Sequence, residues 1–253
     1  PALSIGYHPP FFPLIEALFN AVLGINTWSS RLAVLAFALL GMVAWYKLTT
    51  RIFDRTVAFW SSLLLVTTPF LVQWGWYTMS EIPLLSMVLA TGYGFYRYTE
   101  TDRPLYLYLT ALLFGAAVWT KQTAVFMAPW FALYMLFSGK WPVYSRRKEF
   151  WLALGIGVLM VAPLAAITVW LGKANLAQSI GAVEAHMPSR LSWHNLSLYP
   201  KLLVTVQLSL PVLVLSAIGL ALAAWKRDAR MLYMLALVVA TYVVFSFLQA
   251  KEA

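Results

Sequence analysis

Residues 150–171, FWLALGIGVLMVAPLAAITVWL, form an apolar run without a single charged side chain. A helix needs about 20 mostly apolar residues to cross the hydrocarbon core of a membrane, and this run is long enough. The residues just before it include the basic cluster Arg146-Arg147-Lys148, which is typical of the cytoplasmic end of a spanning helix. The segment therefore predicts a transmembrane helix.

The composition of the whole chain supports a membrane environment. Of 253 residues, 62% are hydrophobic and 11% are charged, whereas a soluble globular domain has about 45–50% apolar and about 25% charged residues. A soluble enzyme is excluded, because a water-soluble fold of this size could not cover so much apolar surface. The chain has no cysteine, which excludes a thiol nucleophile, a cysteine-ligated metal and a disulfide. The net charge of +9 fits basic loops on one side of a membrane better than a nucleic-acid partner.

We predict an all-α fold, a polytopic transmembrane helical bundle that forms a single integral membrane domain over residues 1–253. Residues 11–24 are too few to span and contain Glu16, so we expect a juxtamembrane helix within residues 8–24. Because the chain starts at Pro1 without Met and stops just after an apolar run, we expect it to be a fragment of a longer protein. Eight segments are expected to span the membrane, namely 31–50, 56–78, 83–98, 104–120, 122–137, 150–171, 202–225 and 231–248.

The placement of basic residues predicts the orientation. With eight crossings, 12 of the 18 basic residues and every multi-residue basic cluster fall on one side, which the positive-inside rule assigns to the cytoplasm. The other side receives the 8–24 helix, a polar loop at residues 172–201 and all three histidines. Any chemistry is therefore expected at the extracytoplasmic face, and a bacterial inner membrane is the expected setting.

Polar residues at the extracytoplasmic ends of the spans are the candidate functional residues. His8 stands before two prolines that would fix it at the start of the juxtamembrane helix. Glu81 opens a span, where capping alone would explain it, although a carboxylate there could also bind a metal, orient an acceptor or take a proton. Lys121 lies between two apolar helices, where it could extend to water or attract a lipid phosphate. The remaining candidates are Glu184, His186 and Arg190 in the 172–201 loop and Lys251 after the last span.

The order of these elements resembles the GT-C membrane glycosyltransferases, in the branch that contains protein O-mannosyltransferases and the lipid A aminoarabinose transferase. Each motif is weak alone, but their order and spacing cover nearly the whole chain. Five features carry the resemblance: His8-Pro-Pro before a juxtamembrane helix, Arg31 at the start of the next span, Glu81-Ile-Pro83, Thr120-Lys121 between two spans, and the late Lys251.

The resemblance implies a glycosyltransferase that moves a sugar from a polyprenyl-phosphate donor to a lipid, glycan or protein acceptor outside the cytoplasm. Glu81 would be a catalytic carboxylate, and His8 and Glu81 are candidate ligands for a divalent metal. The principal catalytic acid of the family would lie upstream of the His-Pro-Pro motif, so this chain alone is expected to be inactive. The residues expected to bind the substrate or the donor phosphate are His8, Lys121, Glu184, His186, Arg190 and Lys251.

Two alternatives from other functional classes stay open. A transporter or lipid flippase would carry polar groups along a transmembrane path, and the expected spans contain no charged residue between their ends. A non-catalytic membrane scaffold would have its extracytoplasmic polar residues scattered. An enzyme requires instead that these residues lie together.

Overall fold

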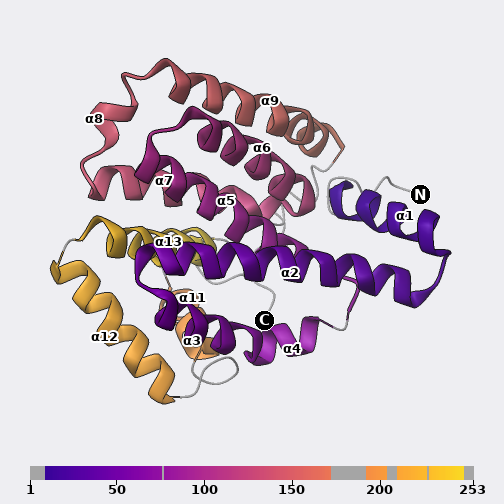
Figure 1. The fold of residues 1–253 in the computed structure, drawn as a ribbon, viewed down its shortest axis with the longest axis horizontal. Coiled ribbons are helices and arrows are strands. Elements are labelled where there is room, and N and C mark those ends of the chain that lie inside the picture. Colours follow the sequence, from indigo (N-terminus) through magenta and orange to yellow (C-terminus); the bar gives the residue numbers. More distant parts are fainter. Residues whose placement is uncertain (1–8, 76, 172–191, 204–209, 227, 248–253) are drawn as a thin grey trace. The chain divides into compact units, whose positions relative to one another are not determined.

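The computed structural model describes residues 9–75, 77–171, 192–203, 210–226 and 228–247, and all regular structure within these ranges is helical (Figure 1). The all-α class expected from the sequence is confirmed. The chain divides into two compact units. The N-terminal unit comprises residues 8–125 and 143–165, and the C-terminal unit comprises residues 126–142 and 166–253 together with 1–7.

Four helices of the N-terminal unit begin at a side-chain cap or with a proline in the first turn. The Asn26 side chain accepts hydrogen bonds from two backbone amides in the first turn of α2, and the Asp54 side chain does the same for one amide of α3. Proline stands in the first turn of α4 and α6, where its missing N–H costs nothing. The helices are α1 (Phe11–Leu23), α2 (Thr27–Ile52), α3 (Arg55–Val66), α4 (Pro69–Trp74), α5 (Glu81–Thr101) and α6 (Pro104–Thr120).

Helix α5 is the centre of this unit and packs against α2 on one side and α6 on the other (Figure 1). Two glycines allow the close approach. A Cβ on Gly41 would lie 2.9 Å from the Cα of Ser86, and a Cβ on Gly94 would lie 2.9 Å from Oγ1 of Thr110. Because only Asp102 and Arg103 separate α5 from α6, the two helices form an antiparallel hairpin. The start of α5 therefore lies at the same end as the finish of α6.

A helix, α1, is present within residues 8–24 as expected, but the expected span 56–78 is broken. Helix α3 ends at Val66 and α4 begins at Pro69, because proline has no N–H to continue the hydrogen-bond ladder and its ring blocks the preceding turn. Within the described ranges, three helices are long and apolar enough to cross a membrane unaided, namely Thr27–Ile52, Lys148–Trp170 and Ala229–Phe247. The other apolar helices in these ranges are shorter or carry charges near their ends.

Helix α9 (Lys148–Leu171) follows a short turn, α8 (Trp141–Tyr144). Its interior Pro163 removes one N–H from the helical ladder. The indole of Trp119 on α6 donates to the backbone carbonyl of Met160 at 2.7 Å, so a neighbouring helix supplies a donor close to the interruption. Large apolar side chains such as Leu159 and Trp170 are exposed along α9, as expected for a helix that faces lipid. The chain is an integral membrane protein.

The C-terminal unit contains α7 (Met127–Phe137), preceded by the 3₁₀ turn η2 (Gln122–Phe126), and α11 (Trp193–Leu202), α12 (Leu210–Lys226) and α13 (Ala229–Phe247). The fully buried Trp130 of α7 donates its indole N–H to the carbonyl of Tyr233 on α13 at 3.0 Å. Tyr134 and Trp130 both pack their rings 4.9 Å from that of Tyr233. This aromatic cluster joins α7 to α13.

Part of the expected 172–201 loop is helical. Residues 193–202 form α11, and the hydroxyl of Tyr242 on α13 donates to the carbonyl of Leu196 at 2.8 Å. The sequence analysis missed α11 because its polar residues and Pro200 resemble a loop, whereas tertiary contact with α13 supports the helix. Residues 172–191 of the expected loop lie outside the described ranges.

Candidate functional site

The N-terminus of α5 positions Glu81. This residue is in the first turn, where a carboxylate interacts favourably with the positive end of the helix dipole. Ser80 occupies the N-cap position but has a helical backbone conformation and makes no side-chain cap hydrogen bond. Ser80 therefore does not cap α5.

The C-terminus of α6 positions Lys121. Its backbone is extended, its amide donates to the carbonyl of Ala117, and its carbonyl accepts from the amide of Ala124 at 3.0 Å. Both backbone groups are therefore used to join α6 to the following 3₁₀ turn. The side chain leaves the helix at its end, where the carbonyl ends of the helix favour a cation.

The two residues form an ion pair across the hairpin. The ammonium Nζ of Lys121 donates to Oε1 of Glu81 at 2.9 Å, although the two residues are 40 positions apart in sequence. The side chains are 34% and 24% exposed, respectively, so the pair is partly shielded from water. The start of α5 and the end of α6 lie together here, and we call this region the Glu81 end of the hairpin.

The second carboxylate oxygen of Glu81 has no partner. Oε2 is buried and forms no hydrogen bond, although a buried polar atom is normally paired. A carboxylate oxygen can accept two hydrogen bonds. The pair therefore presents an anchored cation and a free acceptor next to each other, which suits a ligand that carries both a phosphate and a hydroxyl.

The other predicted site residues are not tested by the structure. His8, Glu184, His186, Arg190 and Lys251 lie outside the described residues. The structure describes two of the candidates, Glu81 and Lys121, and both lie at the Glu81 end of the hairpin.

The metal site expected from His8 and Glu81 stays a prediction, because His8 lies outside the described residues. No group of three metal-ligating side chains of the His, Cys, Asp and Glu types occurs in the described part of the chain. One oxygen of Glu81 is occupied by Lys121, and a nearby ammonium disfavours a second cation. A divalent metal at the Glu81 end would therefore need ligands besides Oε2 of Glu81.

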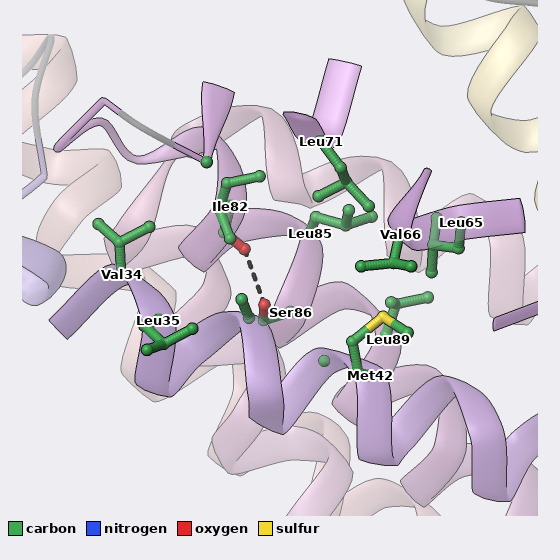
Figure 2. A pocket seen from close by; sticks show the side chains of 13 residues that line it. Val34, Leu35, Met42, Leu65, Val66, Leu71, Ile82, Leu85, Ser86 and Leu89 are labelled. Atoms are coloured by element: carbon green, nitrogen blue, oxygen red, sulfur yellow. Dashed lines mark hydrogen bonds between the residues drawn. The ribbon is translucent and has the colours of Figure 1, made fainter. Parts of the chain in front are cut away.

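An apolar cavity of about 160 Å³ begins next to Glu81 on α5. Figure 2 shows Ile82, Leu85 and Leu89 of α5 facing side chains from α2, α3 and α4 across this space. The hydroxyl of Ser86 is turned back to the carbonyl of Ile82 at 2.8 Å, which leaves the lining almost entirely hydrocarbon. The sequence analysis did not predict this cavity, because it depends on how four helices pack.

The opposite end of the hairpin, the Asp102 end, is rich in paired charges. Arg147 donates to Asp102 at 2.7 Å, and Arg97 donates to Glu100 at 2.6 Å. Asp102 has a left-handed backbone conformation (φ 54°) and ends α5. Hydrogen bonding to Asp102 raises the pKa of the Arg147 guanidinium above its ordinary value, so Arg147 stays charged. Arg147 of the predicted basic cluster lies at this end of the hairpin, and its pairing with Asp102 was not predicted.

Comparisons with known proteins give the same assignment as the motifs. The sequence pattern of the dolichyl-phosphate-mannose-protein mannosyltransferase family matches residues 7–167, more than half of the chain. The fold is similar to that of ArnT from Cupriavidus metallidurans, solved in a crystal bound to undecaprenyl phosphate, with a TM-score of 0.73 and 16% sequence identity. The similarity covers 98% of this chain and 46% of that one, so the chain spans about half the length of that protein. No curated protein sequence matches the chain.

Proposed function

Because the chain belongs to the dolichyl-phosphate-mannose-protein mannosyltransferase family, we propose that the whole protein transfers a sugar from a polyprenyl-phosphate donor to an acceptor at the membrane surface. The observation that carries this proposal is the ion pair between Lys121 and Glu81 at 2.9 Å, with one carboxylate oxygen left free. The pair lies at the ends of two apolar helices, where the headgroup of a membrane lipid would be. A sugar, a phosphate and an acceptor could meet there while the polyprenyl chain stays in lipid.

Lys121 is assigned to the donor phosphate. In the transfer, a hydroxyl or amine of the acceptor forms a bond to the anomeric carbon of the sugar. The bond from that carbon to the phosphate oxygen breaks, and the electron pair leaves with the polyprenyl phosphate. An ammonium held beside the departing oxygen stabilises the charge that develops on it. Glu81 positions this ammonium through Oε1.

Glu81 is assigned a second role through Oε2, which accepts a hydrogen bond from the reacting hydroxyl or amine of the acceptor. We propose that the proton finally passes to a carboxylate base upstream of the His-Pro-Pro motif, as the family resemblance implies. His8 and Glu81 stay candidate ligands for a divalent metal.

The apolar cavity beside Glu81 is assigned to the part of the polyprenyl chain nearest the phosphate. Its lining from Ile82, Leu85 and Leu89 on α5 and from facing helices is hydrocarbon, which matches an isoprenoid in chemistry. Burial of apolar surface there would add affinity at about 25 cal/mol per Å². The chain would thereby be held with its phosphate close to Lys121.

We further propose that the Glu81 end faces the extracytoplasmic side of a bacterial inner membrane. This orientation rests on the placement of the basic clusters. Residues His8, Glu184, His186, Arg190 and Lys251 keep their expected roles in binding the substrate or the donor phosphate. A tag inserted in the Arg146-Arg147-Lys148 loop should be inaccessible from outside the cell, and external labelling of that tag would reverse the orientation.

The transfer reaction tests the proposal in the whole protein reconstituted in lipid. Lys121→Ala and Glu81→Gln should each lower the rate by about 100-fold or more, as for the loss of a group that stabilises developing charge. Lys47→Ala and Glu100→Gln change the same residue types at the other ends of α2 and α5 and should leave the rate unchanged. Wild-type rates in both Glu81-end variants would refute the site.

A further inference from the structure

A second cavity, of about 280 Å³, lies at the Asp102 end of the hairpin. This volume is near the lower end of the range for small-molecule sites, roughly 300–1,000 Å³. The cavity is lined by Tyr98, Asp102, Pro104, Arg147 and Glu149, all in the N-terminal unit. Glu149 is in the first turn of α9, which is long and apolar enough to span a membrane. The cavity therefore lies at a membrane boundary, in the leaflet opposite the Glu81 end.

Tyr98 supplies a buried hydroxyl that forms no well-aligned hydrogen bond, although the guanidinium of Arg147 lies beside it. The residue is 1% exposed, and its ring packs 5.1 Å from that of Tyr144, so its position is fixed. Its hydroxyl is buried without a hydrogen-bond partner, although it lies in the wall of a cavity with charged neighbours. Buried hydroxyls of tyrosine usually find a partner. The orphaned hydroxyl points to a bound molecule that supplies an acceptor or a donor.

The charges around the cavity are mixed in sign. Nη1 of Arg147 donates to Oδ1 of Asp102, and the guanidinium has five N–H groups in all, so donors remain for a ligand. Glu149 forms no ion pair among those of the described residues. Its position in the first turn of α9 would also stabilise that helix, so the position alone would not indicate a ligand. The carboxylate and the guanidinium together nevertheless offer an acceptor for a cation and donors for an anion in one cavity.

We propose that this cavity binds the phosphoethanolamine headgroup of a membrane lipid, with its ammonium on Glu149 and its phosphate on Arg147 and the Tyr98 hydroxyl. A primary ammonium can donate hydrogen bonds to a carboxylate, whereas a quaternary choline cannot. Two carboxylates, Asp102 and Glu149, disfavour a headgroup with net negative charge. The mixed charge of the cavity therefore selects a zwitterionic lipid with N–H donors. This inference goes beyond the proposed transferase activity and does not depend on it.

Native mass spectrometry of the whole protein, stripped of lipid and titrated with defined lipids, tests the proposal. Phosphatidylethanolamine should bind at least tenfold more tightly than phosphatidylcholine or phosphatidylglycerol of the same acyl chains. Water-soluble O-phosphoethanolamine should compete weakly. Equal binding of the three lipids would overturn the proposal, and tight binding of the soluble compound without the lipid would show a soluble metabolite site instead.

Variants locate the binding in the cavity. Glu149→Gln should remove most of the preference for phosphatidylethanolamine over phosphatidylcholine. Tyr98→Phe should weaken the binding of both lipids about equally, because the variant loses a contact to the phosphate that both lipids share. Glu100→Gln changes an acid at the same end of α5 that pairs with Arg97 and does not line the cavity, so it should bind like the wild type. If Glu149→Gln does not fold, Tyr98→Phe alone decides. Wild-type lipid binding in a folded Tyr98→Phe variant would overturn the assignment.

Discussion

The two ends of the α5–α6 hairpin carry charge in different amounts and leave different atoms unsatisfied. At the Glu81 end, one ion pair joins α5 to α6, and the atom left over is a carboxylate oxygen. At the Asp102 end, two ion pairs form, Arg97 also lies over the ring of Tyr106, and the atoms left over include the Tyr98 hydroxyl and Nε of Arg97. The first end keeps a free acceptor beside a single cation, whereas the second keeps free donors among paired charges.

This difference suits the Glu81 end to the transfer reaction and the Asp102 end to helix packing and lipid binding. A free, charged acceptor beside an ammonium can meet a reacting hydroxyl and a phosphate at once, which suits group transfer. Exposed ion pairs contribute little energy each, but the pair between Arg147 and Asp102 joins the end of α5 to the segment before α9. We therefore expect substitutions at the Glu81 end to affect the reaction, and substitutions at the Asp102 end to affect stability and lipid binding.

Reversal of the charge of Lys121 should have the largest effect. In Lys121→Glu, two carboxylates would lie close together at the Glu81 end, and the donor phosphate would meet repulsion in place of an ammonium. Transfer should fall by at least about 1,000-fold, while the protein still inserts in the membrane. Initial rates at matched protein amounts measure this. Lys47→Glu, an equal reversal at an exposed position on α2, is the control, and a Lys121→Glu rate above a tenth of wild type would contradict the assignment.

Substitution of Gly94 tests whether the spacing of α5 and α6 matters to the Glu81 end. A Cβ there would lie 2.9 Å from Oγ1 of Thr110, which is itself bonded to the carbonyl of Tyr106 and cannot easily move. Gly94→Ala should destabilise the protein by about 1–3 kcal/mol and lower the rate of transfer. The thermal unfolding midpoint in detergent measures the first effect.

Two further variants control this prediction. Combining Thr110→Ala with Gly94→Ala removes the clashing atom and should recover much of the loss in the thermal unfolding midpoint. Gly155→Ala on α9, where a Cβ meets nothing within 4 Å, should not lower it. An unchanged midpoint in Gly94→Ala would show that the helices are not packed as described.

The smallest effect is expected from Asp102→Asn. Asparagine tolerates the left-handed backbone at this position, so the substitution removes the charge and leaves the turn. The ion pair with Arg147 is exposed enough, at 57% for the Asp102 side chain, to contribute only about 0.5 kcal/mol. The rate of transfer should change by less than about threefold. A large loss of transfer would show that the two ends of the hairpin are coupled.

The sequence predicted the features that depend on local pattern. Apolar runs predicted the helices, and charge counting placed Glu81 and Lys121 on the same side of the membrane, as the ion pair requires. Local pattern also predicted the helix within residues 8–24, which is α1. The order and spacing of five weak motifs, from His8-Pro-Pro to Lys251, were sufficient to identify the family.

Features that depend on contacts between distant segments could not be predicted. The pairing of Asp102 with Arg147 joins residues 45 positions apart, and the apolar cavity needs four helices to meet. Pro69 gave a local signal for the break between α3 and α4, but proline is common in membrane helices, so the signal was not decisive. Ser80 matched the type of residue expected at a helix cap, yet its backbone conformation does not let the side chain act as one.

The central claim is that Lys121, held by Glu81, binds the phosphate of the polyprenyl donor. The most direct test is the affinity of the whole protein for a polyprenyl phosphate that carries no sugar, measured for the wild type, Lys121→Ala, Glu81→Gln and the double variant. We predict that Lys121→Ala weakens binding by at least about tenfold, and that Glu81→Gln adds little further loss once Lys121 is absent, because its contribution to phosphate binding acts through that ammonium. Wild-type affinity in Lys121→Ala would contradict the claim.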